Sequence, residues 1–290
     1  MPPLTGSIQI GFAGLGNLGM PMARHLVDQG WPVVVHDVVP DRMHECAGNG
    51  ATVADTALDL ARCQLVALAV PDDDAVADTL ERRGVLDALK PGSVVVVHST
   101  VLPGTVQRLA ARAAEAGIEF IDAPVSGGAE RAREGTLTLM AGGTDAAVGA
   151  AQVYLDAVAS TVVHVGPAGS GAVAKLANQL MMFASLAGAY EALDIAAAHG
   201  VGAAEVLGAV RTSTGDSWVA RHWGFFDDVA HAYDASQVPV GKRPWSKDLQ
   251  EVVTVAEAAD VAAPLAHLLA QGLAQRVEAH AARTADRDQA

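Results

Sequence analysis

The sequence has little cysteine, no pattern of metal-binding histidines and no tract of basic residues. Its 290 residues hold two cysteines, Cys46 and Cys63, and ten histidines, and neither type forms a CxxC or HExxH pattern. Isolated thiols are more typical of free cysteines in a reducing compartment than of a disulfide framework. We therefore expect two free cysteines and no metal site.

Positive charge is also scarce. The chain has 19 lysines and arginines against 33 aspartates and glutamates, so its formal net charge is −14. A charge of this sign argues against nucleic acid or an anionic membrane as a partner. The first residues show neither a basic segment nor a long apolar run, and no later stretch reaches the ~18 uninterrupted apolar residues of a membrane helix. We expect a cytoplasmic protein.

Apolar residues are abundant and come in strand-sized blocks. They make up 51% of the chain, and from Ser7 to Val165 short apolar runs alternate with helix-like segments. This alternation predicts an α/β fold with a doubly wound sheet of parallel strands and right-handed crossovers. The expected strands are Ile8–Ala13, Val33–Asp37, Leu65–Val70, Val94–His98, Ile118–Asp122, Leu137–Ala141 and Val162–Val165, and the expected helices include Pro21–Gln29, Asp41–Ala47, Val106–Ala116 and Asp145–Val158.

Beyond Val165 the strand-like runs stop. The breaker cluster Gly166–Gly171 precedes a proline-free stretch, Ala172–His199, that is long enough for a helix of ~40 Å. Further helices are expected at Ala203–Arg211, Trp218–Phe226, Lys247–Ala259 and Pro264–His280, with an irregular segment at Asp227–Pro244 and a frayed tail at Arg283–Ala290. We therefore expect two domains, residues 1–165 with the sheet and residues 166–290 with helices alone.

A glycine pattern follows the first strand directly. It reads Gly14-Leu15-Gly16-Asn17-Leu18-Gly19 and leads into a helix-forming segment. The first glycine of such a pattern makes the turn, the second lets the backbone approach a pyrophosphate, and the third lets helix and strand pack closely. The phosphates are then held by the free N–H groups of the helix N-terminus. A flexible glycine turn is the alternative, but the position between strand and helix favours a dinucleotide site.

Asp37 ends the next apolar run, at about the ~20-residue distance expected for a ribose-binding acid. Its carboxylate can accept hydrogen bonds from the adenosine ribose, and it would repel a 2′-phosphate. We therefore expect NAD, with NADP possible because Arg42 stands close by in the sequence. The alternative is that Asp37 is only a turn residue.

Four segments together resemble the β-hydroxyacid dehydrogenase family, within the 6-phosphogluconate dehydrogenase superfamily. They are the glycine pattern continued through Met20-Pro21-Met22-Ala23, the loop and strand from Asp122-Ala123-Pro124-Val125-Ser126-Gly127-Gly128 to Gly143, the helix start Gly169-Ser170-Gly171-Ala172-Val173-Ala174-Lys175-Leu176-Ala177-Asn178, and Lys247-Asp248-Leu249. The resemblance implies a Rossmann-type NAD(P)-binding domain, a long interdomain helix and a helical domain. It also implies hydride transfer between nicotinamide and a 3-hydroxyacid or its semialdehyde.

The resemblance assigns the general acid/base to Lys175. Asn178 and Gln179 follow it by three and four residues, so the three share one helix face. A lysine in a dehydrated cleft suits proton transfer because burial lowers its pKa. A solvated surface lysine is the alternative.

Other roles follow from the same motifs. Ser126, Gly127 and Gly128 offer consecutive N–H groups that can bind a substrate carboxylate, with an ordinary loop as the alternative. Thr100 matches a position near the nicotinamide ribose and the substrate, although it would also pass as a helix N-cap. The resemblance further places Val70, Pro71 and Lys247 at the cofactor.

Three departures from the family pattern lie near the expected substrate pocket. Gln179 stands where the family has a second asparagine. Arg131 replaces a glycine of the substrate loop and would add positive charge there, as would Lys242 and Arg243. The segment before Lys247 lacks the usual phenylalanine pattern.

Aromatic residues are few, and half of them fall close together. Six of twelve lie between residues 218 and 245, namely Trp218, Trp223, Phe225, Phe226, Tyr233 and Trp245. They predict either an apolar wall of the substrate pocket, with Trp218 and Trp245 as contacts, or the core of the helical domain. A wall of this kind suits a carboxylate substrate bulkier than the smallest semialdehydes.

The long helix and the apolar face of Pro264–Ala274 offer more apolar surface than a small helical domain buries alone, so we expect a homodimer or a larger homo-oligomer.

Two other functions remain open. An imine reductase has a similar architecture, but those enzymes usually carry aspartate or tyrosine at the position of Lys175. A non-catalytic nucleotide-binding module would keep the glycines without the lysine.

Overall fold

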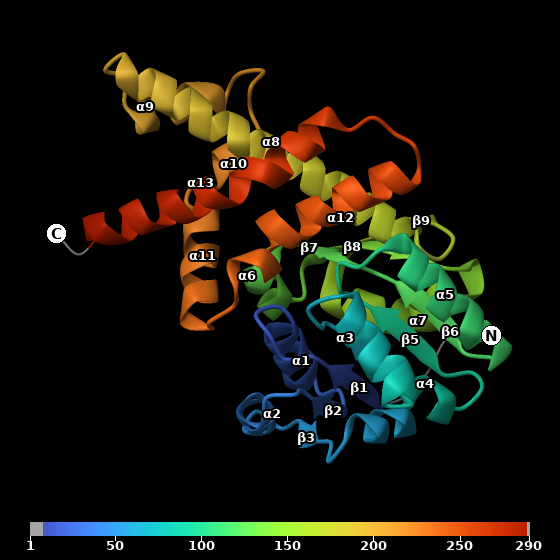
Figure 1. The fold of residues 1–290 in the computed structure, drawn as a ribbon. Helices are drawn as coiled ribbons and strands as arrows, with labels where there is room; N and C mark the ends of the chain where they lie inside the picture. The colour runs from blue at the N-terminus through green and yellow to red at the C-terminus, as the bar shows by residue number, and fades with distance from the viewer. Residues whose placement is uncertain (1–7, 289–290) are drawn as a thin grey trace. The chain divides into compact units, whose positions relative to one another are not determined.

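The computed structural model describes residues 8–288, which divide into two compact units (Figure 1). The first unit ends at Lys175 and the second begins at Leu176, so the dividing point lies inside the long helix α8, Ser170–Ala198. The predicted domain limit after residue 165 falls shortly before this helix. Lys175 therefore belongs to the unit with the sheet, and Asn178 belongs to the helical unit.

The first unit is built on one nine-stranded sheet in the order β3-β2-β1-β4-β5-β6-β8-β7, with β9 also paired to β8. Strands β1 to β6 pair in parallel, β8 runs antiparallel to β6 and β7, and β9 is parallel to β8. The bounds are β1 Ile10–Ala13, β2 Val33–His36, β3 Thr52–Val53, β4 Leu65–Leu68, β5 Val94–Val97, β6 Glu119–Asp122, β7 Val125–Ser126, β8 Leu137–Gly142 and β9 Ala159–Gly166.

Helices and short turns of helix connect these strands. They are α1 Gly19–Asp28, α2 Pro40–Ala47, η1 Ala57–Arg62, α3 Asp73–Ala77, η2 Asp78–Arg82, α4 Val85–Ala88, α5 Pro103–Glu115, α6 Gly128–Glu134 and α7 Asp145–Val158. Prolines stand at the starts of α2 and α5, where the missing N–H group costs no hydrogen bond.

Both faces of the sheet are covered. Along β5, Val94 and Val96 pack with α1 and α7 in one core, while Val95 and Val97 pack with η1, α3, α4 and α5 in the other. Successive side chains of a strand point to opposite faces, so a strand buried on both sides must be apolar throughout. The doubly wound sheet predicted from the apolar runs is confirmed, although β7 and β8 make its end antiparallel rather than parallel.

Over its described residues, 176–288, the second unit contains helices and no strand, as predicted. After α8 come α9 Ala203–Val210, α10 Trp218–Arg221, α11 Phe225–Ala235, η3 Val240–Lys242, α12 Pro244–Ala258 and α13 Pro264–Asp288. Its main core joins the rings of Phe183, Phe226 and Trp245 with leucines of α8 and α13.

Three details of the helical unit correct the expectations. The helix expected at Trp218–Phe226 ends at Arg221, because Gly224 adopts a left-handed conformation with φ of 100°. The segment after it, expected to be irregular, is helical up to Ala235, with Asp227 and Asp228 in its first turn where the helix dipole favours negative charge. Helix α13 continues through most of the tail that was expected to fray, and residues 289–290 lie outside the described part.

Helix α8 is apolar over most of its length. An 18-residue window of it has a mean hydropathy of 1.3, yet only 17% of that window is buried within the chain. By length and composition this helix could cross a membrane, a test that a core helix of a soluble protein also passes. Its exposed apolar side chains include Met181 and Ile195, which are 72% and 63% exposed.

Candidate functional site

The glycine turn after β1 leaves room for the backbone to pass close to a neighbouring strand. Gly14 has φ of 91°, and a Cβ atom there would lie 2.5 Å from the backbone oxygen of Ala69. Helix α1 begins at Gly19, and its N-cap residue, Leu18, provides no side-chain cap. The first N–H groups of a helix have no partner within the helix and attract anions. The turn therefore fits a pyrophosphate, as the sequence predicts.

Asp37 joins the end of β2 to this turn. Its Oδ2 accepts a hydrogen bond from the Leu15 N–H at 2.6 Å, and its Oδ1 accepts one from the Val39 N–H at 2.8 Å. The guanidinium of Arg42 lies 3.7 Å from the same carboxylate. Asp37 is thus more than a turn residue, because it holds the glycine turn itself.

The loops after β4 and β5 lie side by side and bring further predicted residues together. The N–H of Val70 donates to Ser99 Oγ at 3.0 Å, next to Thr100. Pro71 follows in the same loop. The two loops follow neighbouring parallel strands and therefore lie at the carboxyl edge of the sheet. Doubly wound folds bind their ligands at this edge.

His98 was not singled out in the sequence analysis as a site residue. Its Nδ1 lies 2.8 Å from the backbone oxygen of Ala123, and its Nε2 lies 2.7 Å from the hydroxyl of Tyr154. Burial lowers the pKa of His98 to about 4, so the ring is neutral at pH 7. A neutral ring that donates at Nδ1 and accepts at Nε2 satisfies both partners. The partners are 25 and 56 residues away, and no local pattern indicates them.

Lys175 contacts the predicted carboxylate loop. Its Nζ donates to the backbone oxygen of Val125 at 2.9 Å, directly before Ser126. Gly127 and Gly128 follow with φ of 134° and 70°. The lysine and the Ser-Gly-Gly loop, 50 residues apart in sequence, therefore lie together.

Arg131 lies next to this loop. A Cβ on Gly127 would come within 2.9 Å of the Arg131 side chain, and Arg131 Nη2 is 3.4 Å from Ser160 Oγ.

Asp122 begins one of the segments that resemble the family, but the sequence did not predict it as a site residue. It is 1% exposed, and its two carboxylate oxygens accept hydrogen bonds from the N–H groups of Gly169 and Ala172 at 2.9 and 2.8 Å. Burial raises the pKa of Asp122 to about 6, and the N–H donors oppose that rise. The carboxylate thus anchors the start of α8.

In the helical unit, a buried polar chain surrounds Lys247. Gln179 Nε2 donates to Asp248 Oδ2 at 2.7 Å, and Asn178 Nδ2 donates to Gln179 Oε1 at 3.2 Å. Lys247 Nζ lies 3.1 Å from Asp248 Oδ1 and 2.9 Å from Glu251 Oε1. Burial lowers the pKa of Lys247, but the two carboxylates outweigh it and the net shift is upward. Lys247 is therefore a fixed cation.

The two aromatic residues predicted to contact substrate have different settings. Trp245 is fully buried in the core of the helical unit, and its Nε1 donates to Glu278 Oε1 at 2.8 Å. Trp218 is 45% exposed and stacks on His222 at 4.3 Å between ring centroids.

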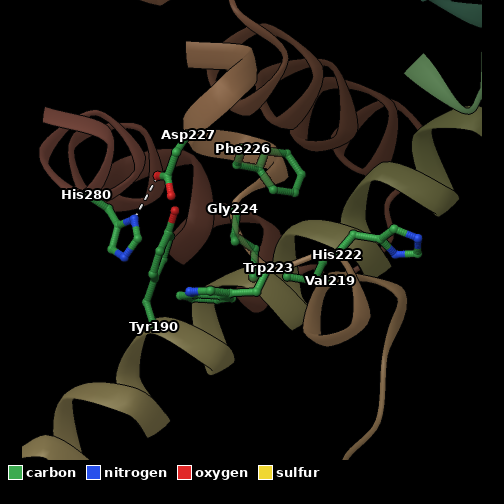
Figure 2. Close-up of a pocket in the computed structure, with 9 residues that line it drawn as sticks. Tyr190, Val219, His222, Trp223, Gly224, Phe226, Asp227 and His280 are labelled. Carbon is green, nitrogen blue, oxygen red and sulfur yellow. Dashed lines mark hydrogen bonds and ion pairs between the residues drawn. The ribbon is translucent and has the colours of Figure 1, made fainter. Parts of the chain in front are cut away.

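A small, partly open pocket lies in the helical unit. Figure 2 shows Tyr190, Trp223 and the hydrogen bond between His280 and Asp227 around it. Two of the aromatic residues predicted as a possible substrate wall, Trp223 and Phe226, line it, but Trp218, Trp245 and the residues predicted for the cofactor do not. Over the described residues 8–288, no group of three His, Cys, Asp or Glu side chains is placed to hold a metal ion.

Both units match known protein families. Residues 9–166 match the NAD binding domain of 6-phosphogluconate dehydrogenase, and residues 169–290 match the family described as NAD-binding of NADP-dependent 3-hydroxyisobutyrate dehydrogenase.

Individual relatives agree along most of their length. The chain is 32% identical to human mitochondrial 3-hydroxyisobutyrate dehydrogenase over 267 residues, covering 89% of this chain and 79% of the relative. It is 32% identical to an NAD-dependent L-serine dehydrogenase of Pseudomonas aeruginosa over 281 residues, covering 92% and 94%.

A solved structure of Mycobacterium tuberculosis 3-hydroxyisobutyrate dehydrogenase with L-serine superposes with a TM-score of 0.81 at 28% identity, covering 95% of this chain and 96% of that one. An imine reductase from Pseudomonas sp. is 20% identical with a TM-score of 0.63, and covers 92% of each chain, so it shares the fold alone.

Proposed function

We propose that this chain, which belongs to the 3-hydroxyisobutyrate dehydrogenase-like β-hydroxyacid dehydrogenase family of NAD(P)-dependent oxidoreductases, interconverts a 3-hydroxyacid and its semialdehyde with Lys175 as general acid/base. The nicotinamide, when bound, supplies or accepts the hydride. The observation that carries the proposal is the contact of the Lys175 ammonium with the Val125 backbone oxygen, because it holds a proton-transfer group against the loop suited to the substrate carboxylate.

The loop supports a substrate that carries a carboxylate. Ser126, Gly127 and Gly128 follow Val125 directly, and the two glycines have positive φ, a backbone geometry that turns consecutive N–H groups toward an anion. A carboxylate bound there would place the 3-hydroxyl near Lys175 Nζ. As the neutral amine, Lys175 would take the hydroxyl proton during oxidation, and as the resulting ammonium it would return a proton to the carbonyl oxygen during reduction. Thr100 would orient the substrate from the end of β5.

NAD is the proposed cofactor, in preference to NADP. The Asp37 carboxylate stands at the end of β2, where it can accept hydrogen bonds from a ribose and would repel a 2′-phosphate. Arg42 lies 3.7 Å from that carboxylate and partly balances its charge, so NADP is the weaker cofactor rather than an excluded one. Gly14 and the α1 N-terminus would hold the pyrophosphate, and Val70 belongs to the same proposed set of contacts.

The alternatives are separated by one set of assays. Turnover of NAD with 3-hydroxyacids, including 3-hydroxyisobutyrate and L-serine, is the result expected here, and both compounds join a carboxylate to a 3-hydroxyl. Turnover of NADPH with cyclic imines alone would favour an imine reductase. Cofactor binding without turnover of any compound would leave a nucleotide-binding module.

A second copy of the chain is the proposed cover for the exposed apolar side of α8. Met181 and Ile195 on this helix and Leu268 on α13 are more than half exposed, at 72%, 63% and 66%. Large apolar side chains exposed to this extent support an interface at this surface. We therefore propose a homodimer or a larger homo-oligomer.

A further inference from the structure

Asp122 ends β6 and faces the first turn of α8. Its carboxylate receives two hydrogen bonds, one at each oxygen, from the backbone N–H groups of Gly169 and Ala172. Charge-assisted bonds of this kind are about twice as strong as neutral ones. They also satisfy N–H groups that a helix start leaves without intrahelical partners.

The same two segments are joined a second time, by Lys175. Asp122 and Val125 are three residues apart on one strand-loop segment, and Ala172 and Lys175 are three residues apart on α8. Asp122 accepts from Ala172 at 2.8 Å, and Val125 accepts from Lys175 at 2.9 Å. One turn of helix is thus fixed at both ends against a short length of backbone.

Close approach of the backbones makes this double attachment possible. A Cβ on Gly171 would lie 2.7 Å from the Asp122 backbone oxygen, and a Cβ on Gly142 would lie 2.7 Å from the Gly171 nitrogen. Real Cβ atoms do not come this near, so both positions require glycine. The helix start is therefore packed directly onto β6 and β8.

We propose that Asp122 is a positioning residue, whose carboxylate fixes the first turn of α8 so that the Lys175 ammonium stays on the Val125 oxygen beside the Ser-Gly-Gly loop. The role of Lys175 in proton transfer rests on the proposed function; the anchoring of α8 does not.

The negative charge on Asp122 predicts a pH dependence that a packing role alone would not produce. The groups that act on the carboxylate are backbone N–H donors, those of Gly169, Ala172, Gly171 and Asp122 itself, and burial is what raises its pKa to about 6. Protonation below that pH relieves the cost of burying the charge, which stabilises the folded chain as a whole, but it also replaces the charge-assisted bonds to α8 by weaker neutral ones. The start of α8 can then leave the still-buried carboxyl at lower cost. Lys175 should then be held less firmly.

The test compares Asp122→Asn with Thr144→Ala. The asparagine keeps the shape of the side chain but offers one acceptor oxygen in place of two. Thr144 caps α7 through a hydrogen bond from the Ala147 N–H at 3.0 Å, so its alanine variant removes a helix cap elsewhere in the same unit. Three quantities are measured for each protein: hydrogen exchange of the amides of residues 169–175, labelling of Lys175 by an amine-reactive ester, and kcat and KM for the best hydroxyacid.

Asp122→Asn should speed exchange at residues 169–175 by about tenfold or more, the scale of one lost bond to a charged group. It should label Lys175 faster and lower kcat by about 10- to 100-fold, the cost of a misplaced catalytic group, with the KM for cofactor within about twofold. Thr144→Ala should leave the labelling and kcat at wild-type values.

Unchanged labelling of Lys175 in Asp122→Asn would overturn the proposal, as would unchanged kcat in an active enzyme. If the wild type turns over no hydroxyacid, the proposed function fails, and the exchange and labelling data still decide the anchoring. If Asp122→Asn does not fold, wild-type exchange at pH 5 and pH 7.5 decides. The segment 169–175 should lose protection at pH 5 relative to α1, and equal protection would refute the anchor.

Discussion

The side-chain amide of Gln179 donates to the carboxylate of Asp248, with Nε2 2.7 Å from Oδ2, and both residues are buried. The amide oxygen of Gln179 accepts from Asn178 in turn. Gln179 stands where the family pattern has an asparagine, and its longer side chain ends at the Asp248 carboxylate. This departure therefore has a structural partner, in the polar chain that leads to Lys247.

Replacing Gln179 by leucine should destabilise the protein by about 1–3 kcal/mol, because it leaves a buried carboxylate oxygen without its donor. Urea unfolding measures the change. Gln152→Leu is a matched control, since Gln152 makes a 2.7 Å bond to Asp156 on the exposed side of α7. The control should cost less than about 0.5 kcal/mol. Equal effects of the two variants would mean that the Gln179 bond adds nothing.

Lys175→Ala should lower kcat by about 100-fold or more, the usual scale for a positioned acid or base. Cofactor affinity, measured by fluorescence titration, should stay within about twofold, because the contact of Lys175 is with the Val125 loop. Lys90→Ala, at an exposed lysine, serves as the control. A folded Lys175→Ala protein with wild-type kcat would rule out the assigned role.

Asp37→Asn should shift cofactor preference toward NADP. The change removes the charge that repels a 2′-phosphate and leaves Arg42 available to bind one. The ratio of kcat/KM for NAD to that for NADP should fall by about tenfold or more. A wild type that already works better with NADP would contradict the preference at once.

The stability difference between wild type and Asp122→Asn should depend on pH. The pKa of Asp122 is about 6 in the folded protein against a usual 3.8, so the folded state binds the proton more tightly than the unfolded state. Wild type should therefore gain stability relative to the variant as pH falls from about 6 to about 4, by about 3 kcal/mol in all. Urea unfolding of both proteins at several pH values measures this difference. A difference that stays constant with pH would show that Asp122 titrates normally.

Met181→Glu should weaken self-association, because it places a charge on a side chain that is 72% exposed and that we propose is covered by a second copy. Light scattering at micromolar concentration should give at least twice the chain mass for wild type and a lower mass for the variant. Leu58→Glu, at an apolar residue 48% exposed on η1, is the control and should keep the wild-type mass. A monomeric wild type would exclude the oligomer.

Local patterns predicted the parts of the fold that local forces determine. Helix α7 runs over Asp145–Val158 as expected, because Thr144 caps it and a continuous apolar face follows. Each valine of β5 is buried on one face or the other, which its unbroken apolar run indicates. Helix α11 was missed because the glycines and prolines near residues 239–244 suggested a loop that in fact begins only after Ala235.

The residues of the candidate site also divide into those that local sequence patterns identify and those that they do not. The glycine turn and the Lys175 segment could be found from sequence because their residues are contiguous. The bonds of Asp122 to α8 and of His98 to Tyr154 join residues 47 to 56 positions apart, and nothing near either residue indicates its partner. Gln179 and Asp248 are 69 positions apart, so the sequence shows that Gln179 departs from the family pattern but does not show which residue it bonds to.

The burial of Trp245 makes intrinsic tryptophan fluorescence a probe of the helical unit. Three of the four tryptophans, Trp218, Trp223 and Trp245, belong to that unit, and the fourth, Trp31, belongs to the sheet unit. The indole of Trp245 is shielded from water and bonded to a carboxylate, so its emission should lie at short wavelength and move to longer wavelength when α12 and α13 separate. Intrinsic fluorescence therefore reports mainly on the helical unit, whereas far-ultraviolet circular dichroism reports on the helices and strands of both units. Coincident transitions of the two signals would indicate that the units unfold in one step.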